Sequence, residues 1–396
     1  MNKLYRILSL LLIIPLLSGC WDRVEMNDVS FFMASALDLT EDGQLKTSIL
    51  VPIPVAAGGD NGKVSPSGTL GKTYFVVSAK GSNIHDAERS IQQKISRRFF
   101  KGHRRVVFIG EALARKGIKD ILDYYSRDPG SRLRTYIVVT KGKEAIEFLK
   151  NDHPIERIPS EEVRELERSG VGVSATFRDF LMMQARDGIE PVTGAVELVS
   201  PTGTVKEEEK YSLYQLSSTA VFKKYKLKGY LNDIETRSLR WIKEEVKQEI
   251  ISGSIAGSGG NVGVVMNKMS STIQTTMNGE KARIRIVLKG TGVLNEANVK
   301  LDLNQSGSLI LIEDELGKLV ADQTLRTIRK AQTEWKADIF GFGLQLHLFH
   351  YRTWQKIRPK WDAIFSDADV TVTAQISLRR AGIITNSLSE NGVGES

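Results

Sequence analysis

The sequence of 396 residues contains a single cysteine, Cys20, and only five histidines. One cysteine cannot form a disulfide within the chain, and it excludes the cysteine clusters that hold structural zinc. Exported proteins normally carry cysteines in pairs, because their compartment favours disulfides. The lone cysteine therefore needs an explanation from its position in the chain.

Long apolar runs are also missing, since no segment approaches the roughly 18 to 20 residues of a membrane-spanning helix. The apolar run of residues 7–17 is too short to cross a bilayer comfortably, and it follows the positively charged Lys3 and Arg6. This order is typical of an export signal. The next four residues, Leu17-Ser18-Gly19-Cys20, resemble the bacterial lipobox.

The lipobox resemblance implies cleavage between Gly19 and Cys20 and a diacylglycerol on the Cys20 thiol. Two acyl chains hold a protein stably on a membrane, because each buried methylene contributes about 0.8 kcal/mol. Two alternatives are an ordinary secreted protein and a buried N-terminal helix with an incidental, inert cysteine. Neither explains why the only cysteine follows an apolar leader. We therefore predict that residues 1–19 are a cleaved lipoprotein signal peptide.

Composition and charge fit a folded protein beside a membrane. Hydrophobic residues make up 41% and charged residues 26% of the chain, and the net charge is +8. A modest positive excess suits anionic lipid headgroups, whereas an exported protein rarely meets nucleic acid. The basic residues concentrate once, around His103: Arg97, Arg98, Lys101, Arg104 and Arg105. This basic cluster is interpreted either as a solvated loop or as a contact with lipid phosphates or an acidic partner.

Alternating strand and helix patterns predict an α+β fold of several small mixed α/β domains, and the length is sufficient for two or three of them. We expect largely antiparallel or mixed sheets packed by helices. The predicted divisions are a membrane-proximal lead (20–30), an N-terminal mixed α/β domain (31–140), a helix-rich middle region with a linker (141–205), a C-terminal α+β domain (206–382) and a disordered tail (383–396). The polar loop of residues 56–71 has no role that the sequence assigns.

Apolar residues at helical spacing predict several helices: 84–95, 111–125 with a bend near Gly117, a helix from Phe177 onward, 235–251 and 321–346. Candidate N-caps are Ser82 or Asn83 for the first helix and Ser174 or Thr176 for the helix at Phe177. Alternation of apolar and polar residues predicts strands, as do short apolar runs: 282–289, 293–303, 308–313 and 370–378. Residues 252–261 are predicted to be a flexible Gly/Ser loop.

Familiar catalytic and binding motifs are incomplete. Gly71-Lys72-Thr73 lacks the glycine that a phosphate loop needs five positions earlier, where Pro66 stands. The glycines of residues 257–263 have the wrong spacing for a dinucleotide loop. His347 and His350 lie three residues apart but lack the further ligands of a metal site. We therefore predict no catalytic centre, cofactor or metal, and we interpret four tryptophans as core residues: Trp241, Trp335, Trp354 and Trp361.

The residues after the lipobox resemble the mature start of a known family. Cys20-Trp21-Asp22-Arg23-Val24-Glu25-Met26-Asn27-Asp28 is similar to the start of the Ger(x)C spore germination lipoproteins, the C subunits of nutrient germinant receptors. Further stretches resemble the family in the same order: 102–111, 122–128, 132–139, 219–223, 229–231, 235–237, 338–343 and 360–365. The resemblance spans nearly all of the mature chain.

The resemblance implies a fold of three small mixed α/β domains and a non-catalytic protein anchored on the outer face of the spore's inner membrane. It also implies assembly with two membrane-embedded partners, the A and B subunits, in a complex that responds to nutrients. Binding of a small-molecule nutrient by this chain itself is not expected. Near the membrane, Trp21, Asp22 and Glu25 are candidate partner contacts, although they could equally form a spacer. The alternative function is a solute-binding lipoprotein of a transporter, which normally has two similar α/β lobes.

Overall fold

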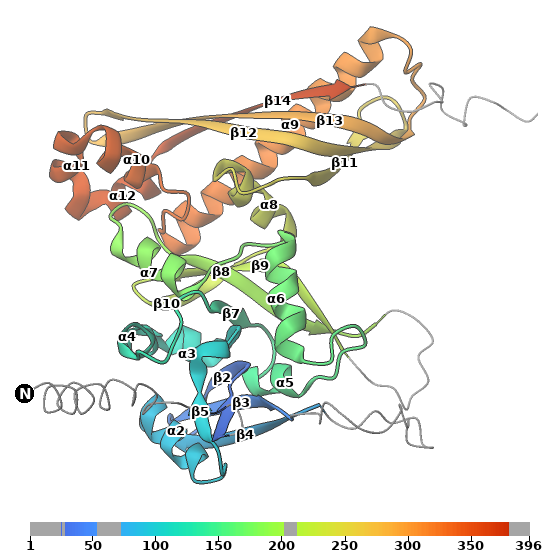
Figure 1. The fold of residues 1–396 in the computed structure, drawn as a ribbon. Helices are drawn as coiled ribbons and strands as arrows, with labels where there is room; N and C mark the ends of the chain where they lie inside the picture. The colour runs from blue at the N-terminus through green and yellow to red at the C-terminus, as the bar shows by residue number, and fades with distance from the viewer. Residues whose placement is uncertain (1–24, 26–27, 54–72, 202–211, 380–396) are drawn as a thin grey trace, which may run out of the picture.

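A computed structural model describes residue 25 and the ranges 28–53, 73–201 and 212–379 (Figure 1). The predicted lipid site at Gly19 and Cys20, the candidate contacts Trp21 and Asp22, and the loop of residues 56–71 lie outside the described residues. The described chain forms two sheets of eight and four strands, a two-stranded pair and helices packed on them. The predicted mixed α/β class is therefore confirmed.

The larger sheet is mixed, with a parallel centre and antiparallel strands on both sides. Its strands, in spatial order, are β10 (Lys226–Leu231), β9 (Leu213–Lys223), β8 (Val192–Val199), β7 (Tyr136–Thr140), β6 (Val106–Gly110), β2 (Ala34–Leu39), β3 (Leu45–Pro52) and β4 (Tyr74–Gly81). The central strands read as continuous apolar runs, as expected for strands with both faces buried.

Helices cover both faces of this sheet. On β6, Val107 and Ile109 face a core shared with α3 (Glu111–Lys116), α4 (Lys119–Arg127) and α7 (Phe177–Ala185). Phe108, which points the other way, packs with α5 (Ala145–Lys150) and α6 (Pro159–Ser169). Beside the sheet, β1 (Val29–Phe31) pairs with β5 (Arg98–Phe100), which runs into the 3-10 turn η3 (Lys101–His103).

The predicted local signals in this part are confirmed. Asn83 caps α2 (Ile84–Gln92) by accepting a hydrogen bond of 2.9 Å from the backbone N–H of Asp86. Thr176 caps α7 in a reciprocal pairing with Asp179. The predicted bend at Gly117 is a full break between α3 and α4, because this glycine has a φ of +132°.

The C-terminal part is a sheet of long strands crossed by one long helix (Figure 1). Its strands are β11 (Glu249–Ile255), β12 (Gly260–Asn278), β13 (Lys281–Asn298) and β14 (Asp369–Arg379), of which β13 and β14 are parallel. Its helical elements are α8 (Asp233–Ile242), α9 (Ser306–Lys330), the π-helical turn η4 (Ala331–Trp335), α10 (Phe342–Phe349), α11 (Tyr351–Ile357), the 3-10 turn η5 (Arg358–Lys360) and α12 (Trp361–Ser366).

Four sequence-based predictions for this part are wrong. The helix predicted over residues 235–251 ends at Ile242, because Glu244 adopts a φ of +58°, and the remainder becomes β11. Residues 252–261 form the end of β11 and a hairpin turn into β12 instead of a loop. Residues 308–313 are the start of α9 instead of a strand. The helix predicted over 321–346 is interrupted between Trp335 and Phe342.

The larger sheet continues across two of the predicted domain boundaries. Strands β8, β9 and β10 extend the sheet that begins with β2, so one sheet joins residues on both sides of positions 140 and 205. The division into three domains stays a prediction. Among the described residues, no helix combines the length and apolar character needed to cross a membrane.

Candidate functional site

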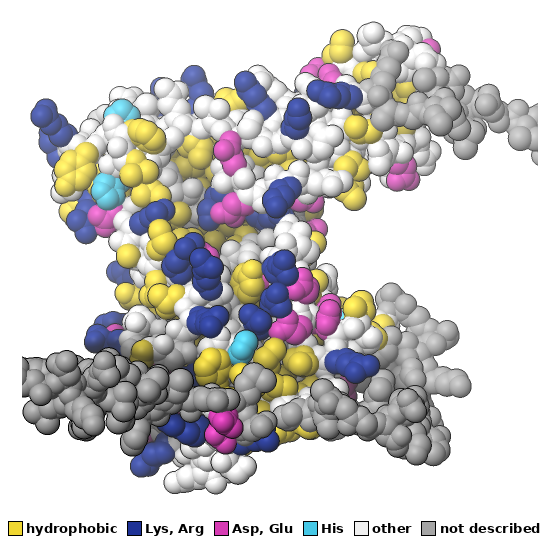
Figure 2. Space-filling view, viewed as in Figure 1, with side chains coloured by type: hydrophobic (Ala, Val, Ile, Leu, Met, Phe, Trp, Pro, Cys, Tyr) yellow, Lys and Arg dark blue, Asp and Glu magenta, His cyan; other side chains and the backbone are white. Residues whose placement is uncertain are grey.

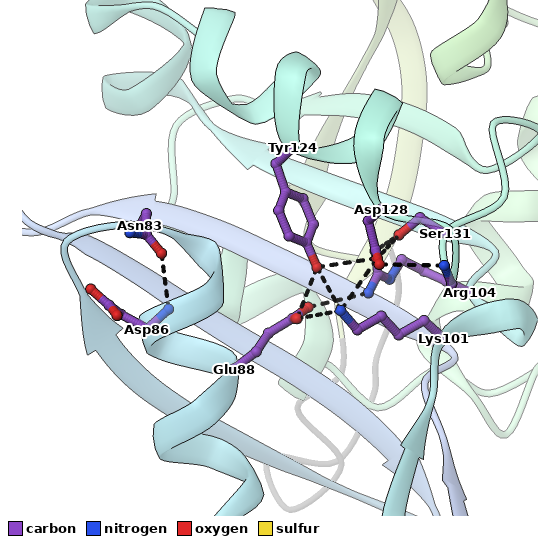
Figure 3. A network of polar contacts seen from close by, with 9 residues as sticks. Asn83, Asp86, Glu88, Lys101, Arg104, Tyr124, Asp128 and Ser131 are labelled. Carbon is purple, nitrogen blue, oxygen red and sulfur yellow. Dashed lines mark hydrogen bonds and ion pairs between the residues drawn. The ribbon is translucent and has the colours of Figure 1, made fainter.

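The most developed polar site in the described chain is a cluster of ionised and hydroxyl side chains between α2, η3 and α4 (Figure 3). We call it the Glu88 network. Its members are Glu88, Lys101, Arg104, Tyr124, Asp128 and Ser131. Figure 3 shows Glu88 reaching from α2 toward Lys101 and Arg104, while Tyr124 and Asp128 reach the same point from the other side.

Short contacts converge on Lys101. Its Nζ lies 2.5 Å from Glu88 Oε2 and 3.3 Å from Asp128 Oδ2. The same nitrogen donates a hydrogen bond of 2.7 Å to the Tyr124 hydroxyl, which donates in turn to Glu88 Oε2 at 2.8 Å. Ser131 donates a hydrogen bond of 2.6 Å to Asp128. The two carboxylates and the Lys101 ammonium therefore hold three separate chain segments together.

Arg104 brings a second positive charge into the network. Its side chain is 1% exposed, and its Nη2 lies 3.5 Å from Glu88 Oε1. The guanidinium also stacks near the ring of Tyr125, at 5.0 Å from the ring centroid. Since arginine stays protonated in proteins, Glu88 is the carboxylate that compensates this buried charge.

The network shifts the acidity of its members in the direction expected for stable ion pairs. Burial alone would raise the pKa of Asp128, but the hydrogen bond from Ser131 and the charge of Lys101 hold that pKa below its usual range. Burial raises the pKa of Tyr124, and the negative charge of Glu88 raises it further. Tyr124 is therefore a neutral hydrogen-bonding group at any physiological pH.

A pocket of about 490 Å³ lies beside the network, between the β2–β3 turn, α2, α3 and α4. Its apolar lining comes from Leu39, Leu45, Ile84, Leu113 and Ile121, and its rim is polar. The rings of His85 and Tyr124 meet edge-to-face in the lining, with centroids 5.0 Å apart. The pocket could hold an apolar side chain or a small amphipathic molecule.

The charged groups of the Glu88 network join chain segments to one another. The charged groups of the Glu88 network are paired with one another, and Tyr124 is held neutral, so none is an activated nucleophile. Among the described residues, no three His, Asp or Glu side chains come together in a way that would hold a metal ion. The network fixes the position of the pocket wall.

A second buried carboxylate, Asp338, organises the segment between η4 and α10. It accepts hydrogen bonds from the backbone N–H groups of Phe340, Gly341, Phe342 and Gly343, at 2.8 to 3.2 Å. Burial raises the pKa of Asp338 to about 6, although these N–H groups act to lower it. The carboxylate thereby caps α10 and satisfies backbone donors that would otherwise be unpaired.

The carboxyl group of Glu167 on α6 is also buried, but it has no ion-pair partner within the part of the chain that the structure describes. The residue is 3% exposed, and burial raises the pKa of this carboxyl to about 8. Ser174 and the backbone of Ala175 offset that effect only in part. Glu167 is thus largely protonated at neutral pH, which lowers the cost of its burial.

The structure divides the predicted basic cluster between buried and exposed positions. Lys101 and Arg104 belong to the Glu88 network, so for these two residues neither a solvated loop nor a partner contact describes the side chain. Arg105 lies 3.6 Å from Glu161, and Arg98 is exposed. Glu25, the described member of the three candidate partner contacts, is exposed.

Sequence reasoning missed the residues that complete these sites. Glu88 is 36 residues from Tyr124 and Asp338 is 23 residues from Trp361, and a lone carboxylate or phenol gives no signal of burial. A usable signal for Asp338 was the run of glycines and phenylalanines that follows it, which supplies closely spaced N–H donors. The four tryptophans predicted to be core residues are all buried, at 8% exposure or less.

Two protein families match consecutive parts of the chain. Residues 22–198 match the family described as "Spore germination protein N-terminal domain", and residues 217–382 match "Spore germination B3/ GerAC like, C-terminal". The two matches together contain both the Glu88 network and Asp338.

Individual relatives align over nearly the whole chain. The putative spore germination protein YfkR of Bacillus subtilis is 26% identical, covering 98% of this chain and 99% of the relative. Spore germination protein KC of the same organism is also 26% identical, over 95% of each chain. The crystal structure of the GerBC protein superposes with a TM-score of 0.54 at 19% identity, covering 87% of this chain and 96% of that one. This last likeness supports the fold.

Proposed function

Because the chain belongs to the GerAC family of spore germination proteins, we propose that it is the lipid-anchored C subunit of a spore nutrient receptor. In this proposal it acts without catalysis, through contacts with the two membrane-embedded A and B subunits. Its place is the outer face of the spore's inner membrane. Nutrient recognition by the assembled receptor, rather than by this chain alone, starts germination.

The observation that carries the proposal is the position of Cys20. The only cysteine of the chain ends a charged and apolar leader, in a sequence that resembles a lipobox. A diacylglycerol there would confine the mature chain to the membrane surface, where its effective concentration for embedded partners is high. Lys3, Arg6 and the apolar residues 7–17 provide the export step.

The buried polar sites stabilise the fold of the chain itself, which is compatible with a non-catalytic subunit. The Glu88 network and Asp338 use their charges to join chain segments, and neither aligns a nucleophile with a base. The pocket beside α4 is formed within one sheet-and-helix layer. A solute-binding lipoprotein would instead place its ligand between two similar lobes, so the alternative transporter function is less well supported.

The test is replacement of Cys20 by serine in spores that depend on this receptor for their nutrient response. We expect the Cys20→Ser protein to carry no diacylglycerol, to leave the membrane fraction and to lower the rate of nutrient-triggered germination by at least about tenfold. Ser18→Ala is the matched control, because it alters the same segment but keeps the cysteine. Mass spectrometry of the mature N-terminus reports the lipid directly.

Two results would contradict the proposal. The first is a Cys20→Ser protein that stays in the membrane fraction at the level of the Ser18→Ala control. The second is deletion of the whole chain with an unchanged nutrient response and intact assembly of the A and B subunits. Both are read in a strain without other nutrient receptors, so that redundancy does not hide the effect.

A further inference from the structure

One end of the C-terminal part exposes a group of large apolar side chains on two short helices. Leu348 and Phe349 at the end of α10 are 65% and 74% exposed, and Tyr351 at the start of α11 is 57% exposed. We call residues 347–356 the α10–α11 tip. In Figure 2, apolar, basic and histidine side chains gather at the end of the molecule where Figure 1 places α10 and α11.

The inner side of the tip is firmly packed, so its exposed side chains do not result from local disorder. Phe342 and Leu346 of α10 and Trp354 of α11 are buried, each at 1% exposure or less. Gln345 accepts a hydrogen bond of 3.0 Å from the backbone N–H of Thr275 on β12. The indole of Trp354 packs on Trp361, with ring centroids 5.6 Å apart. The tip is therefore a rigid platform for its outer residues.

Positive charge surrounds the apolar residues. The stretch from 339 to 361 contains four cationic residues and no acidic one: Arg352, Lys356, Arg358 and Lys360. Arg358 pairs with Asp187 at 3.1 Å, and Lys360 lies 4.0 Å from Glu280. Arg352 and Lys356 are exposed and form no ion pair with any residue that the structure describes. Two free cations thus flank the aromatic and aliphatic side chains.

We propose that the α10–α11 tip binds an anionic lipid surface, as a second membrane contact in addition to the Cys20 anchor. Exposed aliphatic and aromatic side chains beside lysine and arginine are typical of helices that lie in the headgroup region. Tyrosine favours the membrane interface, because its ring is apolar and its hydroxyl is polar. Arg352 and Lys356 supply attraction to acidic headgroups. An acidic protein surface would match these cations but not the apolar group between them.

The inference rests on the proposed function, because the anchor brings the tip close to a bilayer. Its consequence is a fixed orientation: a chain held only at residue 20 can rotate freely, whereas one held at two separate places cannot. The two contacts lie in parts of the sequence more than 300 residues apart. The C-terminal part would then lie against the lipid and present its other faces to the embedded subunits.

The lone cysteine makes a direct test possible. In the lipidated full-length protein Cys20 is blocked, so the Leu348→Cys variant takes up one thiol-reactive fluorophore at the tip. The labelled protein is reconstituted with phosphatidylglycerol vesicles that carry nitroxide lipids. We expect a shift of the emission to shorter wavelength and strong quenching by the nitroxide lipids. The matched control is Ile155→Cys, since Ile155 is 77% exposed but lies on a different part of the molecule.

Two further arms test the role of charge. Vesicles of phosphatidylcholine alone should reduce the quenching of the label at position 348. The double substitution Arg352→Glu with Lys356→Glu should weaken the quenching in phosphatidylglycerol vesicles by about tenfold or more. Both side chains are exposed, so the fold is retained, and an unchanged melting temperature verifies this.

The remaining outcomes either overturn the inference or show that the proposed lipid anchor at Cys20 is wrong while the tip is still tested. A label at position 348 that is quenched no more than the label at position 155 overturns it. A label already shielded without vesicles indicates a contact between copies of the chain and also overturns it. Labelling of the unsubstituted chain would show that Cys20 is free, which contradicts the anchor. In that case Cys20 is replaced as well, and the label at position 348 of the Cys20→Ser, Leu348→Cys protein, with vesicles in excess, decides whether the tip binds lipid.

Discussion

The carboxylate of Asp338 accepts a hydrogen bond of 3.2 Å from the indole Nε1 of Trp361, although the two residues are 23 positions apart. The same carboxylate caps α10 through four backbone N–H groups. One buried side chain therefore fixes the start of α10 and the start of α12 relative to each other.

Replacement of Asp338 by asparagine should destabilise the protein. In the variant, the amide nitrogen of the asparagine would face backbone N–H donors that bind a carboxylate oxygen in the parent protein. We therefore expect the free energy of unfolding at pH 7 to fall by about 2 to 4 kcal/mol. Urea unfolding followed by tryptophan fluorescence measures the loss. Asp367→Asn is the control, because Asp367 is exposed. Equal stability of the two variants would contradict the capping role.

Replacement of Glu88 by glutamine should leave the buried guanidinium of Arg104 without its compensating charge. Removal of one partner from a buried ion pair typically costs about 3 to 5 kcal/mol, and we expect the Glu88→Gln variant to lose stability of that order. Asp123→Asn removes an exposed ion pair with Arg127 on α4, where the expected change is below about 1 kcal/mol.

A double-mutant cycle tests whether this cost comes from the pair. Glu88→Gln should cost much less in an Arg104→Met background, because no buried charge is then left unpaired. Additive effects of the two substitutions would show that Glu88 acts through Lys101 and Tyr124 rather than through Arg104.

The pH dependence of stability should report the buried carboxyl of Glu167. Its pKa is about 8 in the folded protein and near 4.5 when the chain is unfolded. The folded state therefore binds more protons in this window, so its stability falls as the pH rises from about 4.5 to about 8. Glu167→Gln should flatten this dependence. At pH 9 the free energy of unfolding of the variant should exceed that of the parent protein by a few kcal/mol, as expected from the difference between the two pKa values of Glu167.

The measurement is urea unfolding at pH 5 and pH 9. Glu165→Gln is the control, since Glu165 lies on the same helix with a half-exposed side chain. Glu190, whose pKa burial raises to about 7, and Asp338 should preserve part of the dependence in the Glu167→Gln variant. An unchanged pH profile in that variant would rule out Glu167 as a titrating group.

Gly188 should tolerate no side chain. Its φ is +78°, and a Cβ there would lie 2.3 Å from the carbonyl carbon of Gly343. We expect Gly188→Ala to lower the free energy of unfolding by about 3 kcal/mol or more, from backbone strain and the clash together. Gly142→Ala separates these causes, because Gly142 has a φ of +81° and no neighbour within 4 Å. A similar loss in both variants would argue against the close contact.

Local signals in the sequence predicted much of the fold. Asn83, Thr176 and Gly117 act through neighbours within a few residues, and their caps and break are confirmed. The alternation over residues 370–378 likewise predicted β14. Such features depend on side chains next to one another in sequence, so a pattern alone is sufficient.

The wrong predictions lie where contacts between residues far apart in the sequence determine the secondary structure. Residues 308–313 have the apolar and β-branched composition of a strand, but in α9 Ile312 is buried while Ile310 is 56% exposed. Ile250 continues the helical spacing of α8, yet it is 61% exposed on β11, where pairing with β12 determines the structure. The Glu88 network was unpredictable for the same reason, since its members meet only in the folded chain.

The continuous larger sheet has a consequence for dividing this protein. The first family match ends at residue 198 and the second begins at residue 217, yet β8 and β9 pair along their length. In a fragment ending at Val199, β8 would be an unpaired, apolar edge strand, and such strands promote aggregation. A fragment starting at Leu213 would carry the missing strands as an unattached hairpin. When the two fragments are coexpressed, they should associate through pairing of β8 with β9 and rebuild the larger sheet.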